Sequence, residues 1–314
     1  MGVGESPPAK RSHLSAPDHM PELPEVEIVR RGLEPVMAGQ RIVRVEQRRA
    51  DLRFSFPEGF VQRLEGRTIV AVTRRAKYLV VTLNDDTVLI MHLGMSGRFS
   101  IDPGPGHGLE TFGDYVYNTG ANVKHDHVVF TLQSGARIVY NDPRRFGFML
   151  LSSLSKWTTH PLFAGLGVEP LGNELSAAYL ANKAHGKRVS LKAFLLDQRI
   201  VAGLGNIYVS EALHRAGLSP HRRAGTLLRN DGKPTQRANR LVPEIRNVLQ
   251  AAIGAGGSSL KDYRHADGSS GGFQNEFAVY GRDRQPCQRP GCTGTIERTV
   301  QSQRATFACT VCQR

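Results

Sequence analysis

The folded part of the chain opens with the stretch MPELPEVEIVRRGLEPVM, residues 20–37. Its apolar residues recur at spacings of three, four and three, which places them on one face of an α-helix. Pro24 suits the first turn of such a helix, and Gly39 suits the position just beyond its end. We therefore predict an amphipathic helix over residues 24–37. The residues of its apolar face are Val26, Val29, Leu33 and Val36.

Beyond this helix the pattern changes to short β-rich runs separated by turn residues such as those at 84–86 and 134–135. Runs of this kind predict a mostly antiparallel β-sandwich flanked by the helix, as a first domain over residues 20–155. The stretch 102–126 is rich in glycine and polar residues, and we expect a long loop or insertion there. The runs are 41–47, 67–83, 87–95, 127–132, 136–142 and 147–151.

From residue 156 helical periodicity dominates, which indicates a second, helical domain over residues 156–276. Gly203 and Gly205 force a turn just before the third of its helices. Residues 254–276 hold six glycines and are predicted to form a flexible loop. The overall prediction is an α+β chain of several domains. The predicted helices are 172–184, 189–198, 207–216 and 237–253.

Composition limits the class of function. Of 314 residues, 40% are hydrophobic and 22% are charged, which is typical of a globular protein. The sequence holds neither an apolar run of membrane-spanning length nor a secretory signal, so we expect a cytoplasmic protein. Residues 1–19 lack periodicity and are interpreted as a disordered extension or a misassigned start. The net charge of +13 favours a polyanionic partner, either nucleic acid or an anionic membrane.

All four cysteines lie in the last segment, residues 277–314, in the pattern C-x4-C-x16-C-x2-C. Two such pairs of thiolates can close a tetrahedral site, and we expect one structural Zn²⁺ in a zinc ribbon. Two disulfides or free buried thiols are the alternatives. Six arginines stand between residues 282 and 314 against two acidic residues, which suits contact with phosphate. The ligand candidates are Cys287, Cys292, Cys309 and Cys312.

Five features in one order along the chain resemble the formamidopyrimidine-DNA glycosylases, DNA repair enzymes that excise oxidised purines. They are PELPEVE after Met20, Lys77, YNDPRRFG (140–147), GLGNIY (203–208) and the four-cysteine ribbon. The resemblance covers essentially residues 20–314. The opening resembles this branch rather than the endonuclease VIII branch, which usually opens with PEG. It implies a helix–two-turn–helix element in the helical domain, and double-stranded DNA with oxidised bases or abasic sites as the partner.

The resemblance also implies a chemistry that begins at Pro21. An N-terminal proline has a secondary amine, and α-amino groups titrate near 7.7–8.0, so it can attack the sugar C1′ and form a Schiff base. Glu22 suits a general acid that protonates the ring oxygen, and Glu25 is a weaker candidate for the same pocket. Successive β- and δ-eliminations then release the two phosphates. Lys77 corresponds to a residue that contacts the phosphate beside the lesion, and we expect it to act as a catalytic proton donor or as a phosphate clamp.

Flipping a base out of a duplex leaves a void that must be filled. By resemblance Met95, Arg144 and Phe146 fill it, although core packing is an equally good interpretation of Met95 and Phe146 from sequence alone.

Phosphate contacts are expected from three further residues. Lys192 and Asn206 match the helix–two-turn–helix contacts, and Arg304 matches a ribbon arginine that grips the phosphates flanking the lesion. Tyr263 and Arg264 are expected in the loop that closes over the flipped base.

One feature departs from the family. As numbered, Pro21 is internal, and an internal proline nitrogen is an amide with no nucleophilic lone pair. Translation beginning at Met20, cleavage of residues 1–20 and an inactive chain are the three explanations. We favour a start at Met20 followed by removal of that methionine.

Three rival functions remain open at this point. The chain could excise oxidised pyrimidines by the same amine chemistry, or be a non-catalytic zinc-ribbon DNA-binding protein. An RNA-binding ribbon protein fits the charge but leaves PELPEVE unexplained. We expect a monomer that associates with the nucleoid through DNA, and the sequence leaves the preference for the opposite base open.

Overall fold

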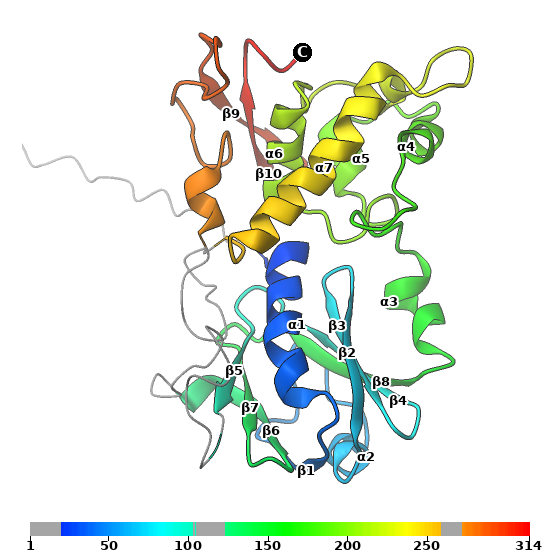
Figure 1. Ribbon diagram of the computed structural model, residues 1–314, viewed down its shortest axis with the longest axis vertical. Helices are drawn as coiled ribbons and strands as arrows, with labels where there is room; N and C mark the ends of the chain where they lie inside the picture. Colours follow the sequence, from blue (N-terminus) through cyan, green and yellow to red (C-terminus); the bar gives the residue numbers. More distant parts are fainter. Residues whose placement is uncertain (1–19, 103, 105–122, 259–271) are drawn as a thin grey trace, which may run out of the picture.

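The computed structural model describes residues 20–102, 104, 123–258 and 272–314. A β-sandwich forms one body and a bundle of helices with a terminal hairpin forms the other, with helix α1 between them (Figure 1). The predicted extension 1–19, most of the predicted loop 102–126, and Tyr263 and Arg264 lie outside the described residues. In the described part of the chain, every helix is too short or too polar to cross a lipid bilayer.

Helix α1 (Leu23–Met37) confirms the prediction for 24–37 and begins one residue earlier. Its apolar face is buried against the sandwich, and its first residue reaches the helical body, where the Leu23 N–H donates to the Gly203 carbonyl over 3.2 Å. The helix ends at Met37 with Ala38 as its C-cap residue, and Gly39 follows with a φ of 79°, a conformation that favours glycine. The helix therefore contributes to the sandwich core and to the contact between the bodies.

Two four-stranded antiparallel sheets form the sandwich (Figure 1). Their facing side chains and the apolar face of α1 make one hydrophobic core. A smaller cluster on the outer face of the second sheet is covered by Phe163 of α3 (Pro161–Ala164). The first sheet has the order β1 (Ile42–Gln47), β6 (Asp126–Leu132), β7 (Arg137–Asn141), β5 (Arg98–Asp102), and the second β2 (Ile69–Arg75), β3 (Tyr78–Leu83), β4 (Thr87–His92), β8 (Phe148–Ser153).

The sequence-based assignment of strands and helices was wrong in several places. The single run predicted over 67–83 is a hairpin of β2 and β3, because the chain turns at Ala76, which has a φ of 54°. No glycine, proline, asparagine or aspartate marks that turn, so the usual turn signal is missing. Strand β5 and the two short helices α2 (Phe60–Leu64) and α3 were not predicted at all.

The helical body contains α4 (Ala177–Ala184), α5 (Leu191–Leu196), α6 (Asn206–Arg215) and α7 (Gln236–Gly254), close to the four predicted helices. Three of them begin after a side-chain cap, from Ser176, Ser190 and Thr235. Helix α4 begins five residues later than predicted because Ser176 caps it. Single-turn 3₁₀ helices lie at Val123–His125, Trp157–Thr159, Ala224–Leu227 and Phe273–Glu276.

The chain closes with a hairpin of β9 (Ile296–Gln301) and β10 (Arg304–Cys309). Ile296, Ala305 and Phe307 are buried in the same hydrophobic cluster as the helices. The ribbon predicted over 277–314 therefore shares a core with the helical body, which supplies apolar burial that so short a segment lacks alone.

A network of charged groups crosses between the two bodies. The Glu169 carboxylate, from the segment before α4, accepts from Arg74 over 3.0 Å and from Arg75 over 2.9 Å. It also accepts the N–H of Ala76 over 2.6 Å, at the turn with positive φ. On the far side, Arg74 donates to Glu27 of α1 over 3.1 Å. Glu169 thus fixes the β2–β3 turn from outside the sandwich.

Replacing Glu169 with alanine should lower the free energy of unfolding by about 1–3 kcal/mol, because two largely buried guanidiniums and one backbone N–H lose their acceptor. Urea unfolding followed by circular dichroism measures this loss. The matched control is Glu34→Ala, which removes an exposed i,i+4 partner of Arg30 and should cost about 0–1 kcal/mol. Equal losses in the two variants would contradict a bridging role for Glu169.

Candidate functional site

The catalytic candidates from the sequence converge where the two bodies meet. A cavity of about 370 Å³ lies there, and its lining includes Met20, Lys77 and Arg304. Pro21, the next residue in the chain, is buried, and Glu22 follows it as the N-cap residue of α1. Residues from the start of the folded chain, a sandwich turn and the terminal hairpin therefore share one site.

Glu22 is the buried acid of this site. Its Oε1 accepts the N–H of Ile207, in the first turn of α6, over 3.0 Å. Its Oε2 is buried and has no hydrogen-bond partner among the described residues. Burial raises the pKa of Glu22 to about 7, although the nearby Lys77 and the N–H groups of α6 act in the opposite direction. Near neutral pH this carboxyl group can therefore hold a proton and give it up.

The close approach of Glu22 to α6 depends on Gly205. A Cβ at residue 205 would overlap the Glu22 carboxyl group, well inside van der Waals contact. Only glycine lets the carboxylate reach the N–H groups at the start of the helix, where the helix dipole also favours negative charge.

The cationic side chains of Arg53, Lys77 and Arg304 line the cavity. Lys77 occupies the turn between β2 and β3 next to Ala76, so the Glu169 network fixes its backbone. Burial lowers the pKa of Lys77, Glu22 raises it and Arg304 lowers it further. Arg304 is exposed at the first position of β10.

Glu25 lies beside this cavity with its carboxylate fully engaged. Oε2 accepts the N–H of Glu22 over 3.0 Å. Oε1 accepts the hydroxyl of Tyr208 over 2.5 Å, and the N–H and hydroxyl of Ser258 over 3.0 and 2.9 Å. Glu25 therefore joins the start of α1 to α6 and to the segment after α7. This arrangement suits a positioning role better than proton transfer.

Lys192 is buried rather than exposed to a ligand. Its ammonium donates to the carbonyl of Ala305 over 2.6 Å and to the hydroxyl of Thr306 over 2.7 Å. Burial and, to a smaller extent, the nearby Arg304 lower the pKa of Lys192 to about 7. In this structure Lys192 holds the backbone next to Arg304.

Asn206 also contacts the terminal hairpin. Its amide donates to the carbonyl of Ala305 over 3.1 Å and to the hydroxyl of Tyr280 over 3.3 Å. Its Oδ1 is buried without a hydrogen-bond partner among the described residues.

The three residues expected to fill a void lie together at the edge of the sandwich. Met95 occupies the turn after β4, and Arg144 and Phe146 occupy the turn between β7 and β8. Phe146 is 44% exposed, and the Arg144 guanidinium lies 5.1 Å from the centre of its ring. An aromatic ring this exposed at a turn is not core packing. Met95 is only partly exposed.

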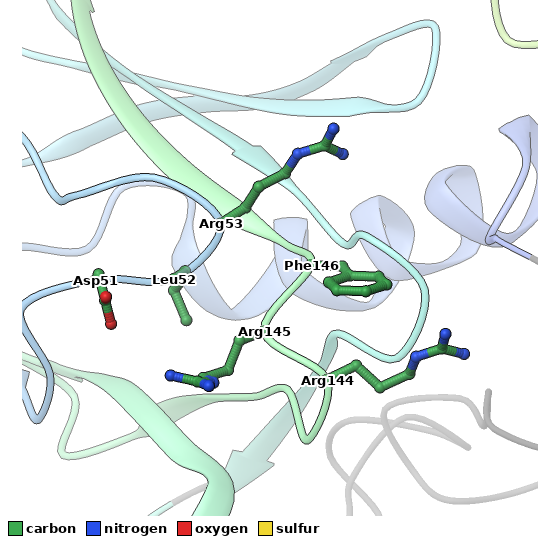
Figure 2. Close-up of a pocket in the computed structure, with 6 residues that line it drawn as sticks. All are labelled: Asp51, Leu52, Arg53, Arg144, Arg145 and Phe146. Atoms are coloured by element: carbon green, nitrogen blue, oxygen red, sulfur yellow. The ribbon is translucent and has the colours of Figure 1, made fainter.

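A second, open cavity of about 500 Å³ adjoins these residues, and Figure 2 shows its lining. The side chains of Arg144 and Arg145 extend to opposite sides of their turn, and the Arg53 side chain extends from a loop of the sandwich in a direction away from Arg145 (Figure 2). This surface offers three guanidiniums and an aromatic ring to a polyanion that carries flat bases.

Several residues of the site were missed from the sequence. His92 lines the first cavity, and its pKa is lowered to about 4 by burial and, to a smaller extent, by Lys77 and Arg53. Tyr208, Ser258 and Tyr280 form hydrogen bonds to Glu25 or Asn206. These residues are far apart in the sequence, so no sequence spacing predicts that they meet. The one local signal is the Gly203-x-Gly205 turn, where glycine lets the Glu22 carboxyl group approach the backbone.

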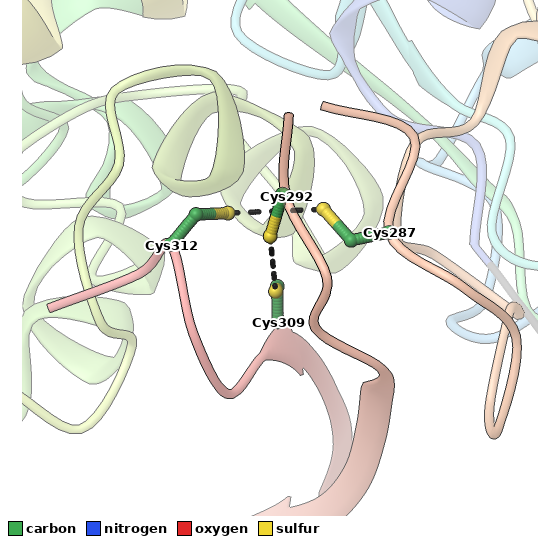
Figure 3. A group of neighbouring side chains, drawn as sticks. All are labelled: Cys287, Cys292, Cys309 and Cys312. Carbon is green, nitrogen blue, oxygen red and sulfur yellow. Dashed lines mark hydrogen bonds between the residues drawn. The ribbon is translucent and has the colours of Figure 1, made fainter. Parts of the chain in front are cut away.

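The four cysteines converge at one point (Figure 3). The sulfurs of Cys287 and Cys312 lie 3.7 Å apart, those of Cys292 and Cys309 lie 3.6 Å apart, and all four lie within 4.8 Å of one another. A tetrahedral zinc ion with Zn–S bonds of about 2.3 Å requires sulfurs about 3.8 Å apart. The cluster therefore has the size of a metal site, and the cysteines are free of disulfides.

Two family models and many known proteins match most of the chain. Residues 20–149 match a family model described as the formamidopyrimidine-DNA glycosylase N-terminal domain, and residues 166–264 match the H2TH domain of that family. A formamidopyrimidine-DNA glycosylase of Methylocella silvestris is 60% identical over 296 residues, which cover 94% of this chain and 100% of the relative.

Solved structures agree over the same span. The MutM (Fpg) protein of Thermus thermophilus is 38% identical with a TM-score of 0.75, and the match covers 93% of this chain and 98% of that chain. A Lactococcus lactis Fpg variant in complex with Fapy-dG-containing DNA is 33% identical with a TM-score of 0.78, covering 94% and 100%.

The raised pKa of Glu22 makes stability depend on pH. A carboxyl group whose pKa rises from 4.5 to about 7 on folding stabilises the protein fully below pH 4.5, and this contribution is lost as pH rises through 7. The stability of Glu22→Gln relative to the parent should therefore increase by about 3 kcal/mol between pH 4.5 and 7.5. Urea unfolding across this range measures it. Glu34→Gln, at an exposed carboxylate, is the control, and a difference for Glu22→Gln that does not change with pH would contradict the assignment.

Proposed function

The chain belongs to the formamidopyrimidine-DNA glycosylase family, and from this premise we propose that it removes oxidised purines from duplex DNA and nicks the resulting abasic site. The observation that carries the proposal is the buried Glu22, whose unpartnered oxygen and pKa of about 7 sit next to Pro21 and beside the cavity that Lys77 lines. A DNA glycosylase with lyase activity needs a proton donor and an amine at the same sugar.

In the proposed reaction Pro21 is the nucleophile. Its nitrogen, once it is the first atom of the chain, forms a bond to C1′ while the glycosidic electron pair leaves with the base. The nitrogen then gives up its own proton, which balances the proton that the departing base takes up and frees the nitrogen lone pair. Glu22 gives a proton to the ring oxygen as the C1′–O4′ bond opens, and the nitrogen lone pair completes an iminium. This electron sink acidifies C2′, so a β-elimination releases the 3′ phosphate and a δ-elimination then releases the 5′ phosphate.

We assign the surrounding cations to the DNA phosphates. Lys77 and Arg304 line the cavity from opposite bodies, so a phosphate beside the extruded sugar can contact both. Lys192 and Asn206 are assigned an indirect role at that phosphate. Both donate a hydrogen bond to the carbonyl of Ala305, and these bonds position the neighbouring Arg304.

Met95, Arg144 and Phe146 are proposed to fill the void that the extruded base leaves. Phe146 is exposed enough to stack between bases, and Arg144 can donate to the base that has lost its partner. The second cavity, which Arg53 and Arg145 also line, would lie against the same strand.

We propose that the four cysteines bind one structural Zn²⁺. The fit rests on the spacing of the sulfurs and on two N–H groups, of Gly294 and Val311, that point at the sulfurs of Cys292 and Cys309 over 3.4 Å each. Such N–H···S contacts favour thiolates. A bound ion would fix the hairpin that carries Arg304. We further propose that the protein acts as a monomer on chromosomal DNA in the cytoplasm.

The proposed chemistry requires a free nitrogen at Pro21. A protein that begins at Pro21 should form a covalent adduct with an 8-oxoguanine duplex in the presence of borohydride, whereas the chain of residues 1–314 should form none, because its Pro21 nitrogen is an amide. Denaturing gel electrophoresis measures the adduct, and mass spectrometry verifies each N-terminus. Equal trapping by both intact proteins would rule out Pro21 as the nucleophile.

The same preparations separate the rival functions. Cleavage of duplexes with an oxidised pyrimidine but not with 8-oxoguanine would favour the pyrimidine-specific alternative. Duplex binding without cleavage of any abasic site would favour a non-catalytic DNA-binding protein.

Loss of the metal should weaken DNA binding. Cys309→Ser should carry less than one zinc per chain by elemental analysis and bind duplex DNA about tenfold more weakly, because Arg304 loses its fixed position. Thr310→Ser, at an exposed neighbour of the same hairpin end, is the control and should retain both zinc and affinity. Full affinity in a zinc-free Cys309→Ser protein would contradict the proposed role of the ion.

A further inference from the structure

The two turns that carry the void-filling residues are packed backbone against backbone. One is residues 93–97, which hold Met95, and the other is residues 142–147, which hold Arg144 and Phe146. Gly94, with a φ of 66°, lies so close to the second turn that a Cβ there would overlap the backbone of Phe146 and of the following residue. The two turns therefore cannot move past each other without separating.

Asp142 is the residue that joins these turns. It is completely buried, and its Oδ1 accepts the hydroxyl of Ser96, in the first turn, over 2.6 Å. Its Oδ2 accepts the N–H of Gly147, at the end of the second turn, over 2.8 Å, and the hydroxyl of Tyr140 over 3.2 Å. One carboxylate thus bonds to both turns and to the strand beneath them.

Ser96 completes the connection. Its hydroxyl oxygen, which donates to Asp142, accepts the N–H of Arg144 over 3.1 Å. The residue beside Met95 is thereby bonded to the backbone of a second void-filling residue. The backbone of Asp142 is fixed as well, because its carbonyl accepts from His127 over 2.8 Å.

The chemistry of these bonds explains why the unit is stiff. A buried carboxylate that accepts three hydrogen bonds makes charge-assisted bonds, which are stronger than bonds between neutral groups. Breaking one of them inside the protein leaves a buried polar group without a hydrogen-bond partner. This loss costs free energy, because water does not reach the buried group to replace the bond. The two turns are therefore expected to stay together when the protein meets DNA.

We propose that Asp142 and Ser96 are positioning residues that couple the two turns, so that Met95, Arg144 and Phe146 enter the base stack as one preformed unit. This inference rests on the proposed function, because it concerns how the same site holds an extruded base. The inference names what holds the void-filling residues in place. Void filling requires a fixed distance between the two turns, and the buried carboxylate of Asp142 sets that distance. Neither residue touches the DNA base or the sugar in this scheme.

The test compares a substrate that has a void with one that has none. Single-turnover rates are measured for an 8-oxoguanine duplex and for nicking of a single-stranded abasic oligonucleotide, which has no opposite strand and no stack to fill. All proteins begin at Pro21. In Ser96→Ala and Asp142→Asn the ratio of the duplex rate to the single-strand rate should fall about tenfold or more relative to the parent, as expected for a lost charge-assisted hydrogen bond.

The matched control is Asp126→Asn. Asp126 lies on the neighbouring strand and accepts the amide of Asn141 over 2.8 Å, but its carboxylate bonds to neither turn. Its ratio should stay within about twofold of the parent value. Thermal unfolding of every variant separates a local effect from loss of fold, and Ser96→Ala, which keeps the carboxylate and two of its bonds, covers the case in which Asp142→Asn does not fold.

The outcomes are distinct. A folded Ser96→Ala protein with the parent ratio would overturn the coupling of the turns and leave the proposed function intact. A fall in both rates by the same factor would show that the carboxylate supports the fold in general, and would also overturn the inference. A parent protein inactive on both substrates would instead overturn the proposed function.

Discussion

The burial of one carboxylate between two bodies of the chain is the constraint on which the site depends. Glu22 is the N-cap residue of α1, and its side chain lies against the first turn of α6, where it accepts the N–H of Ile207. A charged carboxylate would gain from the helix dipole at that point, but the loss of water outweighs the gain, and the pKa rises to about 7. The sandwich and the helices must therefore be docked before the acid has its useful pKa. Gly205 makes the approach sterically possible.

The same docking brings cations close to each other. Lys77 and Lys192 both have a lowered pKa, because burial penalises the ammonium form and Arg304 repels it. An anion placed among these groups would reverse the repulsion and favour the charged ammonium. The proposed DNA phosphate is such an anion, so substrate binding and the protonation of these lysines would support each other. In the free protein these cationic groups repel one another, so the site favours a polyanion. The net charge of +13 favours the same kind of partner.

The sequence predicted the parts of the site that local pattern determines. The apolar face of α1, the four helices and the cysteine spacing are all readable because the residues that define them are neighbours in sequence. The turn at Ala76 was missed because its positive φ is supported by Glu169, a residue of the other body, and not by a turn residue of its own. Lys192 is predicted to contact phosphate, and in this structure its ammonium also donates to the backbone of the terminal hairpin, a contact that no sequence pattern predicted. Contacts of this kind depend on how distant segments dock, which local pattern does not determine.

The terminal hairpin shows why the cavity cannot be assigned to one domain. Arg304 follows a two-residue turn in which Ser302 and Gln303 have φ values of 49° and 62°, a conformation that these residues adopt less readily than glycine or asparagine. The turn is supported from outside, since Lys192 and Asn206 both donate to the carbonyl of Ala305, next to Arg304. The apolar side of the hairpin is buried with the helices, and its other end is the cysteine cluster. The direction of one exposed arginine thus depends on a helical core, a buried lysine and a group of four thiols. A cavity assembled in this way exists only when the sandwich, the helices and the hairpin are docked. Its reactive groups therefore come together only in the folded protein.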